Sequence, residues 1–284
     1  MTKTNNQNLC LMDKRLEITY NDIYNVISLS RCCYTRPFVS LSLEEFKAAD
    51  IFSLAVSENI HERLPGSESS CDLEKEFCHR ILPEIKTVTV GISHACNLSC
   101  YHCFYARHTD SPFQKELYFD TLEKIKGHNL DVIHMQSSGE VFFYYFRLKK
   151  YLESLSLQDT KEVNFQTNGL LLSKGRIEEL FKISKDTHIK FTFSFSVDAV
   201  TEQTYSKVRG GDFNKLLENI SNTIEYFGRD AVAFSFTIKE PNKHEAAQFK
   251  DFIKSTFHYD YNPAYLSFDY FDKSCQEYFL NLEG

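Results

Sequence analysis

Apolar and polar residues follow two different periods along most of the chain. Six runs have the composition and alternation of β-strands, at residues 87–92, 131–136, 163–167, 189–197, 232–238 and 264–268. Between them the spacing of apolar residues predicts helices, at about 120–127, 144–155, 175–183, 214–226 and 245–255. Strands that alternate with helices pair in parallel through crossover connections. We therefore predict an α/β fold, a partial (β/α)6 barrel that resembles a TIM barrel, over residues 85–284.

The predicted strands have one apolar and one polar face. Phe191 and Phe193 alternate with Thr192 and Ser194, and side chains two residues apart share a face of a strand. Neighbouring strands repeat the pattern with polar residues at Asn164, Gln166, Ser235 and Thr237. A fully packed barrel would have apolar residues pointing inward. We expect instead an open, polar lumen, with the aromatic faces under the helices.

Residues 1–84 are predicted to form a mainly helical extension. Ser42 is followed three residues later by Glu45, the pattern of a capping box, and an amphipathic run continues from there to Pro65-Gly66. A second short helix is expected at about 72–82. The extension either packs on the barrel or recognises a substrate.

Composition indicates a globular protein, with 42% hydrophobic and 25% charged residues. A net charge of −7 disfavours a general role in binding nucleic acid, which requires a basic face. The first residues lack the apolar core of a signal peptide, and no run has the length of a membrane-spanning helix. We predict a cytoplasmic protein that binds neither nucleic acid nor membrane.

Three of the nine cysteines, Cys96, Cys100 and Cys103, form a CxxxCxxC motif just after the first predicted strand. A short loop with this spacing is able to direct three thiolates toward one iron–sulfur cluster. One iron of a four-iron cluster would then lack a protein ligand and be open for chemistry. A zinc site completed by His94 or His102 is the alternative, because thiolate and imidazole also suit zinc.

Further motifs follow the cysteine loop, and their order is that of a known family. They are Ser138-Gly139-Glu140, Thr167-Asn168-Gly169, Ser196-Val197-Asp198, Arg209-Gly210-Gly211 and Asn242. From about residue 86 to 254 the chain resembles the radical S-adenosylmethionine (radical SAM) superfamily. The resemblance implies a [4Fe–4S] cluster held by the three cysteines of the motif and S-adenosylmethionine as the second cofactor.

The resemblance also implies which residues bind S-adenosylmethionine. Ser138, Gly139 and Glu140 correspond to a Gly-Gly-Glu-Pro element in which glycine allows close approach and the carboxylate pairs with the methionine ammonium. Ser138 departs from that pattern, and so does Val141. The backbone of His102 is expected to help hold adenine.

Four other positions complete the expected cofactor site. Ser196 and Asp198 are expected to bind the ribose or methionine, and Arg209 to pair with the methionine carboxylate through its planar guanidinium. Asn168 either contacts the cofactor or caps the turn that Gly169 permits. No catalytic acid, base or quenching residue is assigned.

The combined motifs most resemble the branches of the superfamily that modify peptides and proteins. We therefore expect hydrogen abstraction from a peptide or peptide-derived substrate, with a flavodoxin or ferredoxin as electron donor. A small polar metabolite, such as a nucleoside or sugar, is the alternative substrate, and a zinc-bound barrel that only binds a ligand is the alternative function. Cys275 is the only cysteine after the motif, and the spacing of Cys32, Cys33, Cys71 and Cys78 is irregular, so no second cluster is predicted.

Overall fold

The computed structural model describes residues 15–21, 26–30, 39–56, 85–103, 108–136 and 139–268. The strands among them form one sheet in the order β3-β2-β1-β4-β5-β6-β7-β8-β9. All six predicted strands are confirmed and are parallel to their neighbours: β4 (Thr87–Gly91), β5 (Leu130–Met135), β6 (Thr160–Thr167), β7 (Lys190–Ser196), β8 (Val232–Ile238) and β9 (Ala264–Phe268). The chain thus has an α/β fold with a mainly parallel sheet.

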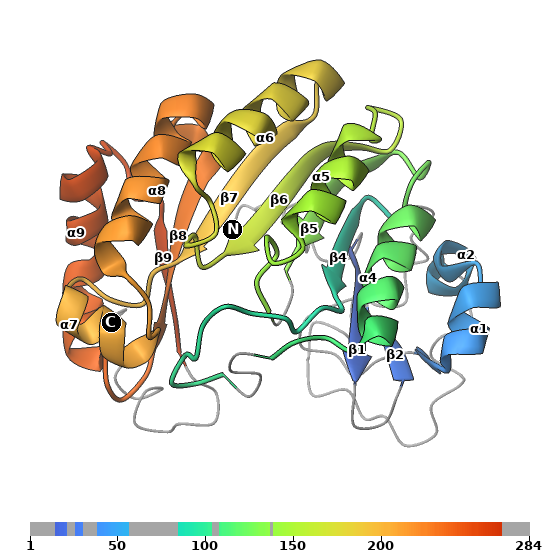
Figure 1. The fold of residues 1–284 in the computed structure, drawn as a ribbon, viewed down its shortest axis with the longest axis horizontal. Helices are drawn as coiled ribbons and strands as arrows, with labels where there is room; N and C mark the ends of the chain where they lie inside the picture. The colour runs from blue at the N-terminus through green and yellow to red at the C-terminus, as the bar shows by residue number, and fades with distance from the viewer. Residues whose placement is uncertain are drawn as a thin grey trace, which may run out of the picture.

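Helices connect these strands and lie in an arc outside them (Figure 1). The five predicted helices are present as α4 (Pro112–Lys124), α5 (Tyr145–Glu153), α6 (Lys174–Thr187), α8 (Phe213–Phe227) and α9 (Ala246–Phe257). Helix α4 begins well before the predicted start, at a Ser111 cap followed by Pro112. The short helix α7 (Glu202–Val208) was not predicted, and two 3₁₀ turns, Arg229–Ala231 and Lys243–Glu245, precede β8 and α9. Within the described ranges, no helix is both long enough and apolar enough to cross a membrane.

The prediction of a mainly helical N-terminal extension is wrong for the part of it that the structure describes. Strands β1 (Arg15–Asn21), β2 (Val26–Ser30) and β3 (Val39–Leu41) form an antiparallel group, and β1 joins the parallel sheet beside β4. Leu16 and Ile18 are fully buried, so a period of two, typical of a half-buried strand, is present in the sequence. A domain boundary at residue 84 stays a prediction, and the β1–β4 hydrogen bonds join residues on both sides of it.

The capping box is confirmed, but the helix that it starts is short. Ser42 caps α1 (Leu43–Ala48), and its backbone N–H donates to the Glu45 carboxylate at 2.8 Å. The chain then becomes extended at Ala49, and Asp50 accepts from the first N–H groups of a separate helix, α2 (Ile51–Val56). The helix predicted at 72–82 lies outside the described residues.

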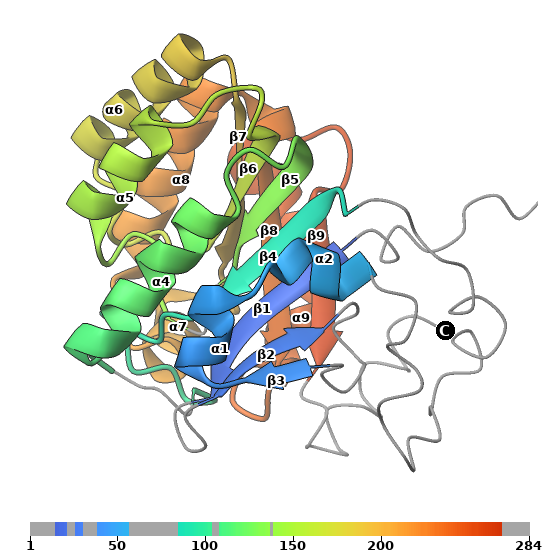
Figure 2. The same ribbon diagram turned by 90° about the vertical axis from the view of Figure 1, so that its right-hand side faces the viewer.

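The two faces of the sheet differ as the alternation predicts. Helices α4, α5, α6 and α8 stack along one face (Figure 2). There Phe165, Phe193 and Phe195 are almost fully buried, and the Phe193 ring lies 4.9 Å from that of Phe227 on α8. The side chains between them, such as Asn164 and Gln166, line a cavity on the opposite face.

Candidate active site

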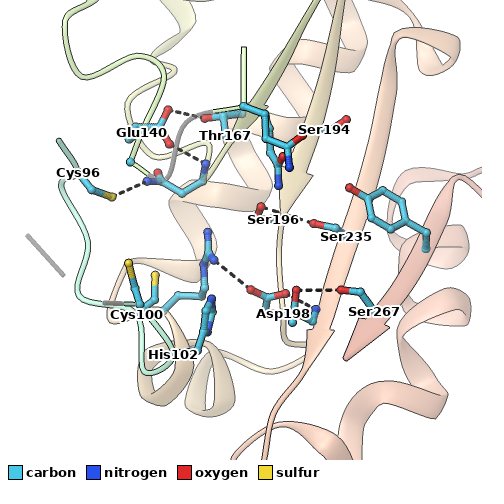
Figure 3. Close-up of a pocket in the computed structure, with 18 of the residues that line it drawn as sticks. Cys96, Cys100, His102, Glu140, Thr167, Ser194, Ser196, Asp198, Ser235 and Ser267 are labelled. Atoms are coloured by element: carbon cyan, nitrogen blue, oxygen red, sulfur yellow. Dashed lines mark hydrogen bonds and ion pairs between the residues drawn. The ribbon is translucent and has the colours of Figure 1, made fainter. Parts of the chain in front are cut away.

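A cavity of about 620 Å³ lies on the inner face of the sheet, next to the cysteine loop. Figure 3 shows Cys96, Cys100 and His102 on one side of it and Ser196, Ser235 and Ser267 on the other. It contains the carboxyl ends of several parallel strands, where α/β barrels carry their active sites. Nearly all predicted site residues line it: Cys96, Cys100, His102, Cys103, Gly139, Glu140, Asn168, Ser196, Asp198 and Arg209. Ser138 lies outside the described residues.

Cys96, Cys100 and Cys103 lie in the loop after β4, and each is a partly buried cysteine that forms no disulfide among the described residues. Burial raises the pKa of Cys96 to about 11 and also raises that of Cys100. Because the thiolate is the form that binds metal, this environment favours ionisation only together with a bound cation.

Asp110 joins the two ends of the cysteine loop. Its buried carboxylate accepts from the Ser93 hydroxyl at 2.6 Å and from the backbone N–H of His94 at 2.9 Å. The backbone N–H of Cys96 in turn donates to the carbonyl of His108 at 3.0 Å. Asp110 was not among the predicted site residues, because an aspartate just before a helix cap looks in sequence like a solvent-exposed residue.

Gly139 lies against the backbone of the cysteine loop. A Cβ at this position would be 2.3 Å from the carbonyl oxygen of Ala95, so only glycine fits. The next residue also stabilises the packing of this segment on the cysteine loop, because the backbone N–H of Glu140 donates to the Ala95 carbonyl at 2.7 Å. The expected close approach at this glycine is therefore made by the protein's own loop.

The Glu140 carboxylate is 2% exposed and accepts three hydrogen bonds from the protein. The donors are the Thr167 hydroxyl at 2.6 Å, the Asn168 backbone N–H at 2.7 Å and the Phe142 backbone N–H at 3.2 Å. Burial raises the pKa of Glu140 above its ordinary value, although these hydrogen bonds act in the opposite direction. Glu140 thus connects the loop after β5 to the end of β6.

Asn168, at the end of β6, contacts the cysteine loop. Its amide nitrogen donates to the Asn97 side-chain oxygen at 3.0 Å and to the Cys96 sulfur at 3.8 Å. Its own oxygen accepts from the backbone N–H of Leu170 at 3.1 Å. Asn168 therefore both caps the turn and positions a predicted cluster ligand.

Asp198 and Arg209 form a buried ion pair. Arg209 Nη1 donates to Asp198 Oδ2 at 3.0 Å, and the other carboxylate oxygen accepts from the Thr237 backbone N–H at 2.6 Å. Burial lowers the pKa of Arg209, but the charge of Asp198 outweighs this and keeps the pKa above its ordinary value. The pair places a fixed cation beside the cysteine thiols.

Asn242 and Glu245 hold the backbone segments that carry this ion pair. The Asn242 amide donates to the backbone carbonyl of Asp198 at 2.9 Å, so it holds the turn in which Asp198 has a φ of 58°. The Glu245 carboxylate accepts from Thr201 at 2.6 Å and from Thr204 at 2.7 Å, which fixes the start of α7. Asn242 belongs to a predicted motif, whereas Glu245 was missed because its partners lie about forty residues away in sequence.

Comparison with known proteins shows the family. The model for the Radical SAM superfamily matches residues 90–253. The chain belongs to the radical SAM superfamily. Members of this superfamily hold a [4Fe–4S] cluster and bind S-adenosylmethionine, and residues 90–253 include the three motif cysteines, Glu140, Asp198 and Arg209.

Individual relatives share low sequence identity with this chain, and each match covers only part of both proteins. The chain is 24% identical over 173 residues to a "Probable GTP 3',8-cyclase" of Methanococcus vannielii, covering 60% of this chain and 56% of the relative. It is 33% identical over 100 residues to the "Putative peptide biosynthesis protein YydG" of Bacillus subtilis, covering 34% of this chain and 31% of the relative. The crystal structure of Streptococcus suis SuiB bound to S-adenosylmethionine matches with a TM-score of 0.45 and 16% identity, over 60% of this chain and 38% of that one. The chain spans about half or less of the length of these relatives.

The donor set fits the cofactors of the superfamily. The three thiols of the radical SAM motif border one cavity, whose polar lining and ion pair suit a charged cofactor. Among the described residues, no three histidine, cysteine or acidic side chains surround a single point as the ligands of one metal ion do. A four-iron cluster takes each thiolate at a different corner, so its ligands are more widely spaced than those of one ion.

Proposed function

We propose that the protein is a radical SAM enzyme that reductively cleaves S-adenosylmethionine and abstracts hydrogen from a peptide substrate, in an open (β/α)6 barrel. The observation that carries the proposal is the common cavity of the three motif cysteines and the Asp198–Arg209 pair. When bound, the reduced cluster supplies an electron to the sulfonium of S-adenosylmethionine, which yields methionine and a 5′-deoxyadenosyl radical.

The protein's own residues hold and orient these groups. Cys96, Cys100 and Cys103 are the proposed ligands of three irons. Arg209 supplies positive charge for the methionine carboxylate while remaining paired with Asp198. Ser196, whose hydroxyl lies 3.5 Å from that of Ser235, is free to rotate toward a ribose hydroxyl.

Glu140 has a different proposed role from the one that its motif implies. Its carboxylate already accepts three hydrogen bonds from the protein, so we assign it to holding the strand ends together. This leaves the backbone around Gly139 to face the cofactor. The backbone of His102, beside the cysteines in the cavity, is the proposed contact for adenine.

The peptide substrate is supported by the similarity to YydG, whose name describes peptide biosynthesis. The second candidate is a nucleotide-like metabolite, because GTP 3',8-cyclases are also among the relatives. A flavodoxin or ferredoxin is the proposed electron donor in either case.

The test is anaerobic purification of the full chain, with iron and zinc quantified, followed by dithionite reduction and an assay for 5′-deoxyadenosine. We expect about four irons per chain and 5′-deoxyadenosine formation, both lost in Cys100→Ala. Cys275→Ala, which changes a cysteine outside the motif, is the matched control and should behave as wild type. One zinc per chain without cleavage would instead support the zinc-bound binding module.

A further inference from the structure

The cavity has a charged part and an uncharged part. Among the described residues that line it, the aspartate, glutamate and arginine side chains are Glu140, Asp198 and Arg209, all near the cysteine loop. The remaining lining, across β5 to β9, consists of amides, hydroxyls and a histidine. The cofactor and the substrate would therefore meet different chemistry in one cavity.

The uncharged lining is arranged in rows across neighbouring strands. His134 on β5 lies opposite Asn164 on β6, which lies opposite Thr192 on β7. The Asn164 amide oxygen lies 3.3 Å from His134 Nδ1, and its amide nitrogen donates to the Thr192 hydroxyl at 2.9 Å. The Thr192 hydroxyl in turn donates to the Glu162 carboxylate at 2.7 Å, so the polar groups of this row are already paired within the protein.

The next row along the strands is different. Gln166 lies opposite Ser194, and Gln136 directly follows β5 on the same face as His134. Within the described ranges, no hydrogen bond joins either glutamine side chain to another residue. Both line the cavity, where Gln166 is half-buried and Gln136 is exposed. Each carboxamide therefore presents two N–H donors and a carbonyl acceptor to whatever occupies the cavity.

A carboxamide matches a peptide group, because each carries one carbonyl acceptor and N–H donors that pair side by side. A phosphate also needs a cation to balance its charge, and neither glutamine supplies one. Arg209 is the only lysine or arginine among the described lining residues, and the proposed function already assigns its charge to the methionine carboxylate of the cofactor. An anion taken from water without a paired cation is strongly disfavoured.

We infer that Gln136 and Gln166 form a substrate-binding site that takes amide groups of an uncharged peptide segment and rejects nucleoside phosphates. This inference rests on the proposed function, since it names the substrate chemistry of the same cavity. It selects between the two substrate classes that the relatives suggest.

Binding is measured first, because it does not require turnover. The anaerobically reconstituted full chain, loaded with S-adenosylmethionine, is incubated with a pool of N-acetylated, C-amidated peptides of varied sequence and, separately, with GTP. Retained ligands are quantified by ultrafiltration and mass spectrometry. Gln166→Leu, which keeps the size but loses the amide, is compared with Gln248→Leu, an exposed glutamine on α9 outside the cavity.

We expect uncharged peptides to be retained over GTP, with retention about tenfold weaker in Gln166→Leu through loss of two hydrogen bonds and unchanged in Gln248→Leu. Retention of GTP in preference to peptides, equal retention by wild type and Gln166→Leu, or retention of no peptide would each overturn the inference. The 5′-deoxyadenosine assay is read separately. Peptide retention through Gln166 without cofactor cleavage would reject the proposed function but leave the peptide site in place.

Discussion

Two groups of polar residues around the cavity differ in how firmly the protein holds them. Beside the cysteine loop, Asp110, Glu140 and Asp198 are buried, and each carboxylate accepts at least two hydrogen bonds from the protein. By contrast, the side chains of Gln136 and Gln166, which also line the cavity, have no such partner in the described chain. The first arrangement preorganises a site, while the second leaves donors and acceptors available to a ligand.

This difference suits the two groups of residues to different ligands. A cofactor of constant structure is best met by groups fixed before it binds, because no ordering cost is then incurred. Side chains without a hydrogen-bond partner in the protein are instead suited to recognise a substrate, because the substrate supplies the missing partner. Substitutions in the two groups should consequently differ: those beside the cysteines affect stability and cofactor binding together, whereas those at the glutamines affect substrate alone.

The largest effect is expected for Arg209→Ala. It leaves the Asp198 carboxylate buried without its cation, which costs about 3–5 kcal/mol of unfolding free energy. S-adenosylmethionine affinity should fall at least about tenfold through loss of a charge-assisted contact. Urea denaturation and equilibrium dialysis measure the two effects.

A double variant separates these two consequences. Asp198→Asn with Arg209→Met removes both charges, and asparagine tolerates the left-handed backbone at position 198. We expect it to be more stable than Arg209→Ala and still defective in S-adenosylmethionine binding. If the double variant bound S-adenosylmethionine with wild-type affinity, Arg209 would not be a cofactor-binding residue.

A smaller effect, about 1–3 kcal/mol of unfolding free energy, is expected for Gly139→Ala, because the new methyl group overlaps the Ala95 carbonyl. The loop must shift at the residue before Cys96, so iron content after reconstitution should fall as well. Gly175→Ala, where a Cβ meets nothing within 4 Å, is the matched control and should keep stability and iron content. Equal iron content in the two variants would contradict a role for this contact in shaping the cluster loop.

The sequence alone predicted those parts of the site that are local in the chain. The cysteine spacing and the motifs ending β6 and β7 each span only a few residues, and the six parallel strands follow from alternation within each run. Asp110 and Glu245 were missed because a carboxylate has the same appearance in sequence whether it is solvated or buried. Only the tertiary fold brings Ser93 to Asp110 and Thr204 to Glu245.

The N-terminal error has a similar physical origin. Leu16 and Ile18 alternate with polar residues over too short a run to outweigh the helical signal that begins at Ser42. Their strand is stabilised by pairing with β4, a contact across about seventy residues. Strand formation of this kind depends on long-range partners, which local patterns do not contain.

The smallest expected effect concerns how stability depends on pH, and it tests whether Glu140 belongs to the firmly held group. In the unfolded chain Glu140 ionises near its ordinary pKa of 4.5, while burial raises the pKa in the folded protein. Between these two values the unfolded state has already lost its proton and the folded state has not, so stability falls as pH rises. Glu140→Gln removes the titrating group, so the stability of this variant relative to wild type should rise over the same window. Urea denaturation at a series of pH values from about 4 upward measures the difference, and parallel curves would mean that the three hydrogen bonds to the carboxylate fully offset its burial.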